Sequence, residues 1–250
     1  MANQGFKSVI RIIYNLYCYF FAVTLLTLFT SWFIAAPLLT KRRRHIFLLN
    51  IVNLYLQILF FLIFIKIEKE GMLKEGQYIY IANHTSYLDA LVALRILKNC
   101  NNLYFIGRAD LCRIPVFGFF YKQVVVPVDR NSLKDRIDNL QKIGDKLKER
   151  CSLFIFPEGT FNNSKNTLLP FKKGAFKLSF DHKVDMLPLI FIDGKKRMNS
   201  NYKFSLTPGK FRVKILAPFN SLQYASYDEL RRVCMNTYEG VLKSAAISLL

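Results

Sequence analysis

Two long apolar runs near the start of the chain constrain its fold more than any other feature of the sequence. No charged residue occurs in residues 12–40, a run longer than the roughly 20 residues that a helix needs to cross a bilayer core. A second apolar run covers residues 46–65, and the basic segment 41–45 separates the two. The pattern predicts a membrane-embedded hairpin of two helices over residues 1–66, with a basic tip.

Two membrane topologies are compatible with such a hairpin. The first run is too long for the apolar core of a cleaved secretory signal, and a second run follows it, so we expect it to be retained. Asn50, Asn53 and Gln57 form a polar stripe on one face of the second helix, which favours a position at the membrane interface. A spanning hairpin with a cytoplasmic basic tip would place the chain after residue 66 on the non-cytoplasmic side, which suits its unpaired cysteines poorly. We therefore favour a hairpin that enters and leaves one leaflet, with the downstream domain at the cytoplasmic face. Full spanning is the alternative.

A strong positive charge accompanies the apolar composition. Lys and Arg number 36 against 17 Asp and Glu, which gives a formal charge of +19. Nucleic-acid phosphates and anionic lipids both attract such charge, but the chain shows no zinc-ligand spacing, RNP-type motif or helix-turn-helix pattern. We therefore predict a phospholipid bilayer as partner, and no nucleic acid. The five cysteines are scattered without a C-x-x-C pair, which argues against disulfides and a metal site and favours a reducing compartment.

After residue 66, short apolar runs alternate with polar, helix-like stretches. This alternation is typical of an α/β fold with a mostly parallel central sheet flanked by helices, here one domain over residues 67–250. The expected strands are residues 78–82, 103–106, 124–128, 153–156, 186–192 and 211–216. The expected helices are residues 87–97, 132–150, 174–180 and 227–244.

Residues 83–89 (NHTSYLD) lie where an expected strand gives way to an expected helix, a usual place for ligand sites in α/β sheets. Asp89 can accept the Nδ1 hydrogen of His84 there, which leaves Nε2 to remove a proton from a hydroxyl. The same letters also form a capping box, in which Ser86 caps the helix and Asp89 only binds a backbone amide. From these residues alone, catalysis and capping are equally open.

A second turn, residues 156–160 (FPEGT), also follows an expected strand. Gly159 permits a tight turn that exposes backbone N–H groups to an anion, and Lys165, Lys172 and Lys173 follow it. Taken by itself, this pattern indicates no more than a turn with basic neighbours.

Together, these segments resemble the sequence blocks of the glycerolipid acyltransferase family. The resemblance rests on residues 83–89 and 156–160, on PVDR at 127–130 and on LLPFKKGAF at 168–176. Within the family the pattern is most similar to the lysophosphatidic acid acyltransferases. It implies transfer of a fatty acyl group from acyl-CoA or acyl carrier protein to the free hydroxyl of 1-acyl-glycerol-3-phosphate. The product would be phosphatidic acid for phospholipid synthesis, and no metal or other cofactor is implied.

The resemblance also implies roles for individual residues. His84 would be the general base and Asp89 the partner that orients it. The residues expected to bind the substrate are Arg130, Glu158, Gly159, Thr160, Arg108, Lys172 and Lys173. No cysteine or serine stands in a nucleophile position beside the histidine, so we expect direct transfer in a ternary complex without a covalent acyl-enzyme.

One position departs from the family pattern, whose third block usually reads P-E-G-T-R. Phe161 stands where the arginine is expected. Neighbouring lysines do not replace it equivalently, because lysine lacks the bidentate fork of arginine. The acceptor therefore stays open between lysophosphatidic acid and another lysolipid, such as lyso-ornithine lipid. A non-enzymatic membrane protein that binds anionic lipid, with residues 84–89 serving only as a helix cap, is the more distant alternative.

Overall fold

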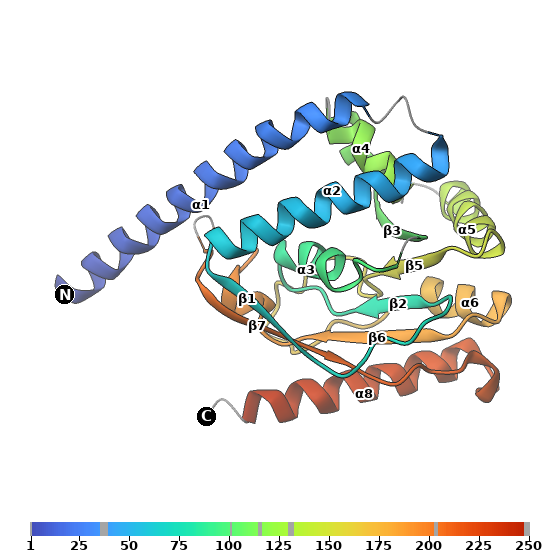
Figure 1. The fold of residues 1–250 in the computed structure, drawn as a ribbon. Coiled ribbons are helices and arrows are strands. Elements are labelled where there is room, and N and C mark those ends of the chain that lie inside the picture. The colour runs from blue at the N-terminus through green and yellow to red at the C-terminus, as the bar shows by residue number, and fades with distance from the viewer. Residues whose placement is uncertain are drawn as a thin grey trace. The chain divides into compact units, whose positions relative to one another are not determined.

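The elements of the fold are labelled in Figure 1, a computed structural model that describes residues 2–35, 40–100, 102–114, 117–129, 133–202 and 205–247. The predicted phosphate ligand Arg130 lies outside these ranges. The helices are α1 (Ala2–Ala35), α2 (Lys41–Leu62), α3 (Leu88–Ile96), α4 (Phe117–Val124), α5 (Leu133–Lys148), α6 (Lys173–His182), α7 (Gly194–Arg197) and α8 (Tyr227–Ile247). The strands are β1 (Ile65–Glu70), β2 (Ile79–Ala82), β3 (Leu103–Arg108), β4 (Val125–Val128), β5 (Ser152–Ile155), β6 (Met186–Phe191) and β7 (Gly209–Ile215).

The strands form a seven-stranded sheet in the order β1-β7-β6-β2-β5-β3-β4. β2 pairs in parallel with β5 and β6, and β3 pairs in parallel with β4 and β5. The predicted α/β fold with a mostly parallel sheet is therefore confirmed. All six expected strands and all four expected helices occur, with bounds within three residues of those predicted.

Three elements differ from the sequence-based expectation: β1, α4 and the four-residue helix α7. The expected hairpin extends to residue 66, whereas α2 ends at Leu62 and β1 begins at Ile65. Phe64 turns the chain between them with a φ of 53°. Residues 65–68 alternate apolar and charged side chains, which is the period-two signal of a strand. The eight residues of α4 are too few to display a helical period in the sequence.

Contacts divide the chain into two compact units, and each is described by itself. Unit 1 comprises Met1–Lys69, His84–Asn99 and Phe191–Val213. Unit 2 comprises Glu70–Asn83, Cys100–Ile190 and Lys214–Leu250. The division of function between residues 1–66 and 67–250 stays a prediction.

In unit 1 the two long apolar helices α1 and α2 pack against each other, and α2 packs on α3. Both helices are long and apolar enough to cross a membrane, judged by length and composition. Large apolar side chains remain exposed along α1, among them Phe6, Ile13 and Phe20. The polar stripe of α2 is partly used inside the unit, because Oε1 of Gln57 accepts a hydrogen bond from Arg95 of α3.

In unit 2 the helices α5, α6 and α8 cover one face of the strands. Ile79 and Ile81 alternate along β2 and therefore point to the same face, where both are completely buried. They belong to one apolar cluster with Ile143 of α5, Phe176 of α6 and Tyr238 of α8. This packing fixes β2, whose carboxyl end leads directly into the segment that begins at residue 83.

Candidate active site

The turn between β2 and α3 brings together the two residues predicted to form a catalytic pair. Nδ1 of His84 lies 3.1 Å from Oδ2 of Asp89. The His84 side chain is 15% exposed, whereas the Asp89 side chain is fully buried. Because the carboxylate engages Nδ1, a role as proton acceptor would fall to Nε2.

The Asp89 carboxylate also accepts hydrogen bonds from the backbone. Its Oδ2 atom accepts hydrogen bonds from the N–H groups of Thr85 (2.6 Å) and Ser86 (2.8 Å). Oγ of Ser86 accepts a hydrogen bond from the N–H of Leu88, the first residue of α3. The capping and catalytic interpretations therefore describe the same carboxylate. Its backbone bonds hold the side chain in the position from which it contacts His84.

The carboxyl group of Asp89 is buried, and burial affects its pKa. Burial raises the pKa of this carboxyl, against the opposing influence of His84 and the two amides. The second oxygen, Oδ1, has no hydrogen-bond partner within the described parts of the chain. A carboxylate placed in this way can stabilise a positively charged imidazole, since it has little solvent to screen it.

The second predicted turn follows β5 in unit 2. Gly159 has a φ of +73°, and its N–H donates to the carbonyl of Phe156. Glu158 is 1% exposed, and its Oε2 atom accepts a hydrogen bond from the N–H of Leu169. The N–H of Lys172 donates to the carbonyl of Pro157, so segment 168–172 closes over the turn.

The side chains around this turn show why it needs a glycine. A Cβ at Gly159 would lie 3.0 Å from Cδ and Cε of Lys172, and the positive φ would strain any other residue. The structure thus brings Glu158, Gly159 and Lys172 together, while Thr160 is exposed beside them. The buried Glu158 carboxylate binds the backbone, which makes it a support of the turn.

Two of the predicted basic ligands are already paired. Arg108 donates two hydrogen bonds to the carboxylate of Asp110, at 3.0 and 2.6 Å, and its guanidinium holds the pKa of Asp110 below its usual range. Nζ of Lys173 lies 3.3 Å from Oδ2 of Asp228. A phosphate would have to compete with these carboxylates. The sequence did not indicate either pairing.

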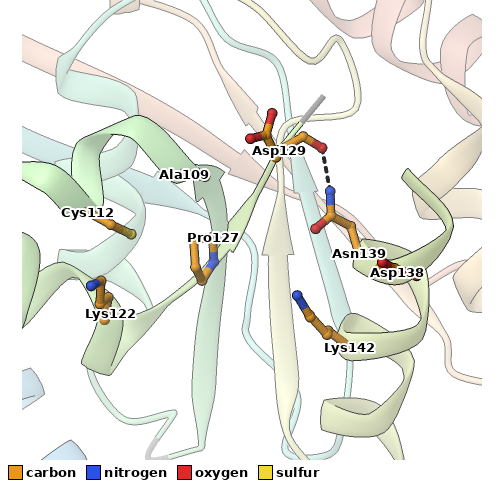
Figure 2. A pocket seen from close by; sticks show the side chains of 8 residues that line it. All are labelled: Ala109, Cys112, Lys122, Pro127, Asp129, Asp138, Asn139 and Lys142. Atoms are coloured by element: carbon orange, nitrogen blue, oxygen red, sulfur yellow. Dashed lines mark hydrogen bonds between the residues drawn. The ribbon is translucent and has the colours of Figure 1, made fainter. Parts of the chain in front are cut away.

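A cavity of about 270 Å³ lies beside the end of β4 in unit 2, next to the predicted phosphate-binding segment (Figure 2). It is lined by Ala109, Cys112, Lys122, Pro127, Asp129, Asp138, Asn139 and Lys142. Nδ2 of Asn139 donates to the carbonyl of Asp129, which ties α5 to the residue just before Arg130. Figure 2 shows Lys122 and Lys142 on either side of Pro127. Within the described ranges, neither ammonium group forms an ion pair.

Cys151, which directly precedes β5, has the properties of a packed side chain. It is 3% exposed, and burial raises the pKa of its thiol. A thiol of this kind is a poor nucleophile, because the thiolate is the reactive form.

Two further residues were not singled out by the sequence. Gly194 at the start of α7 lies against Asp89 and Thr85. The hydroxyl of Tyr238 donates to the carbonyl of Ile81 at 2.7 Å in the interior of unit 2. Gly194 lies three residues after the last residue of β6, and this place near a strand end is the one sequence signal that marks it. Tyr238 carries no such signal.

Comparison with known proteins gives a consistent result. The Acyltransferase family model matches residues 64–192. A chloroplastic 1-acyl-sn-glycerol-3-phosphate acyltransferase of Arabidopsis thaliana is 31% identical over 162 residues, which cover 63% of this chain and 44% of the relative. The protein of the same name from Saccharomyces cerevisiae is 32% identical over 161 residues, covering 63% and 52%. The chain thus spans about half the length of these relatives.

A bacterial relative and a solved structure extend the comparison. The 1-acyl-sn-glycerol-3-phosphate acyltransferase of Salmonella typhimurium is 30% identical over 160 residues, covering 63% of this chain and 62% of the relative. The crystal structure of the 1-acyl-sn-glycerophosphate acyltransferase PlsC from Thermotoga maritima matches with a TM-score of 0.79 and 22% identity. The match covers 95% of this chain and 98% of that one. At this identity the likeness shows a shared fold.

Proposed function

This chain belongs to the Acyltransferase family, and we propose that it transfers a fatty acyl group from a thioester to the free hydroxyl of 1-acyl-glycerol-3-phosphate, giving phosphatidic acid. The hydrogen bond between His84 and the buried Asp89 is the observation that carries this proposal. The names of the relatives at about 30% identity support the choice of acceptor.

The reaction uses His84 first as a base and then as an acid. Nε2 removes the proton of the acceptor hydroxyl while the oxygen attacks the thioester carbonyl, and Asp89 stabilises the imidazolium that results. The tetrahedral intermediate collapses, the carbon–sulfur bond breaks, and the imidazolium returns its proton to the departing thiolate. The ester and the free thiol of the carrier leave, and the histidine is neutral again.

The acceptor's phosphate is assigned to Arg130, the one member of the family's PVDR block that provides a guanidinium. Glu158, Gly159 and Thr160 shape the lysophospholipid site, with Lys172 beside them. Arg108 and Lys173 contribute only if the phosphate displaces Asp110 or Asp228 from them. Such an exchange is feasible because both ion pairs are largely exposed and therefore weak.

The exposed apolar side chains of α1 suit a bilayer, and we assign the two-helix hairpin to membrane association. The basic surface adds attraction to anionic lipid. The catalytic residues then face the cytoplasm, where acyl-CoA or acyl carrier protein supplies the acyl group. Vesicle flotation with and without anionic lipid tests the association, and protease accessibility in sealed vesicles tests the side.

The activity is tested with purified protein, an acyl-CoA or acyl carrier protein thioester, and a panel of lysolipids, with products identified by mass spectrometry. We expect phosphatidic acid as the main product. His84→Ala should reduce turnover by at least about 10²-fold, the lower end of what general acid–base catalysis contributes. His182→Ala, a histidine of α6 outside the proposed site, is the matched control. Near-normal transfer by His84→Ala would refute the assignment and leave the capping interpretation.

A second acceptor is favoured by one observation, the aromatic residue Phe161 where the family has arginine. If Phe161 marks only a rearranged phosphate site, Phe161→Arg should preserve or raise activity on lysophosphatidic acid. If Phe161→Arg instead abolishes a stronger activity on a different lysolipid, such as lyso-ornithine lipid, that lipid is the substrate. A protein that binds vesicles but transfers no acyl group to any acceptor would correspond to the non-enzymatic alternative.

A further inference from the structure

A buried glycine outside all of the predicted site residues lies directly against Asp89. Gly194 begins α7 and is buried within unit 1, which also contains His84–Asn99. A Cβ built on Gly194 would lie 2.5 Å from Oδ1 of Asp89 and 2.5 Å from Oγ1 of Thr85. Gly194 does not have a left-handed backbone, so the requirement for glycine here is one of space.

The carboxylate of Asp89 cannot readily move away from such a Cβ. Its Oδ2 atom is held by the N–H groups of Thr85 and Ser86 and by His84, and the side chain is fully buried. Oδ1 has no hydrogen-bond partner among the described residues, so its position is set by packing against Gly194. Any displacement of the carboxylate therefore disturbs the contact with His84.

The backbone at Gly194 is itself anchored by its neighbour. Asp193 is 3% exposed, and its carboxylate accepts three hydrogen bonds from Arg212 of β7, at 2.8 to 2.9 Å. Burial raises the pKa of Asp193, but the bonds and charge of Arg212 outweigh burial and hold the pKa below its usual value. The ion pair is thus formed at neutral pH, where it fixes the start of α7.

We propose that Gly194, anchored by the Asp193–Arg212 ion pair, is a positioning residue that holds Asp89 in hydrogen-bonding contact with His84. The proposal rests on the proposed function, because it concerns the same catalytic pair. The glycine leaves room for the carboxylate, and the ion pair keeps the glycine from receding. Together they confine Asp89 at Oδ1, while the hydrogen bonds hold Oδ2.

The direct test is Gly194→Ala, with Gly240→Ala as the matched control, because a Cβ on Gly240 of α8 meets nothing within 4 Å. A misplacement of about 1 Å in a catalytic group can cost about 10²-fold in rate, so we expect a fall of that order in kcat with unchanged KM values. Gly240→Ala should retain kcat. Thr85→Ala in the Gly194→Ala background removes one of the two obstructing atoms and should recover part of the loss.

A spectroscopic measurement separates positioning from general destabilisation. We expect Asp89 to select the Nδ1–H tautomer of His84 in the native protein, which ¹⁵N shifts of the labelled histidine rings report, with assignment by comparison with His84→Gln. Gly194→Ala should shift His84 towards the Nε2–H tautomer. Wild-type kcat and tautomer in this variant would overturn the proposal.

If Gly194→Ala does not fold by circular dichroism, Asp193→Asn decides the matter, because it keeps the glycine and removes only the anchoring charge. A lower kcat with the same tautomer change supports the proposal, and wild-type values for both refute it. Failure of the proposed function gives a different result. In that case His84→Ala itself retains activity, whereas failure of this inference alone leaves His84→Ala inactive and Gly194→Ala active.

Discussion

Replacing Asp89 by asparagine should abolish most activity and yet stabilise the fold at neutral pH. The loss of activity follows from the charge that stabilises the imidazolium. At the observed 3.1 Å, two unit charges interact by about 5 kcal/mol at an effective dielectric constant of about 20. The dipole of the asparagine side chain retains part of this interaction, so we expect a loss of about 4 kcal/mol, or about 10³-fold in kcat.

The gain in stability follows from the direction of the pKa shift. Burial raises the pKa of Asp89 in the folded state, so the protonated form contributes stability that is fully present below the unfolded pKa of about 4. That stability is lost as the pH rises through the folded pKa. Asparagine resembles the neutral acid at every pH. The stability of the Asp89→Asn variant relative to the wild type should therefore increase from pH 4 to pH 7.

Two assays on the same preparations check this prediction. Turnover is measured with lysophosphatidic acid and an acyl thioester, and the thermal midpoint is measured in detergent at pH 4 and pH 7. Asp145→Asn, at an exposed ion pair with Lys148 in α5, is the control and should change neither quantity much. Near-normal kcat in Asp89→Asn would refute the argument about activity. The argument about stability would be refuted if the thermal midpoint of the variant minus that of the wild type decreased from pH 4 to pH 7.

Three further changes test other parts of the molecule. Arg130→Ala should lower kcat/KM for lysophosphatidic acid by about 10- to 100-fold, the worth of a charge-assisted hydrogen bond, while hydrolysis of the donor by water changes far less. Cys151→Ala should remain active because its buried thiol is not a nucleophile; a trapped acyl-thioester on this cysteine with loss of activity would contradict direct transfer. Tyr238→Phe, which removes the hydrogen bond to Ile81, should lower the free energy of unfolding by about 1–2 kcal/mol in denaturant titrations, whereas Tyr202→Phe at the surface should not.

The strand and helix pattern was readable from the sequence because it depends on local periodicity. The buried strands β2 and β6 appear as short apolar runs, and α5 and α8 appear as longer amphipathic stretches. Their parallel arrangement follows from the alternation of the two kinds of segment. β1 shows the limit of this approach: the strand is too short and too close to an apolar helix to be distinguished from it, and the hairpin predicted over residues 1–66 takes in its first two residues.

The candidate catalytic pair was also predictable, because both members lie within one short turn. A spacing of five residues within one turn allows the Asp89 side chain to contact His84 without help from distant segments. The second block at 156–160 made the resemblance to the acyltransferases specific. The ion-pair partners of Arg108 and Lys173 could not be predicted from the sequence in the same way. Asp110 is two residues from Arg108 but belongs to no recognisable sequence motif, and Asp228 is 55 residues from Lys173.

Only the tertiary structure decided what surrounds the carboxylate of Asp89. Gly194 and Arg212 lie more than 100 residues away in sequence, and neither carries a pattern that ties it to a catalytic pair. Their importance comes from packing at van der Waals distance and from a buried ion pair, both of which depend on segments that meet only when the chain folds. The sequence by itself determined which groups perform the proposed chemistry. The packing of distant segments determined how those groups are positioned, because steric packing and burial are properties of the folded chain and not of any local run of residues.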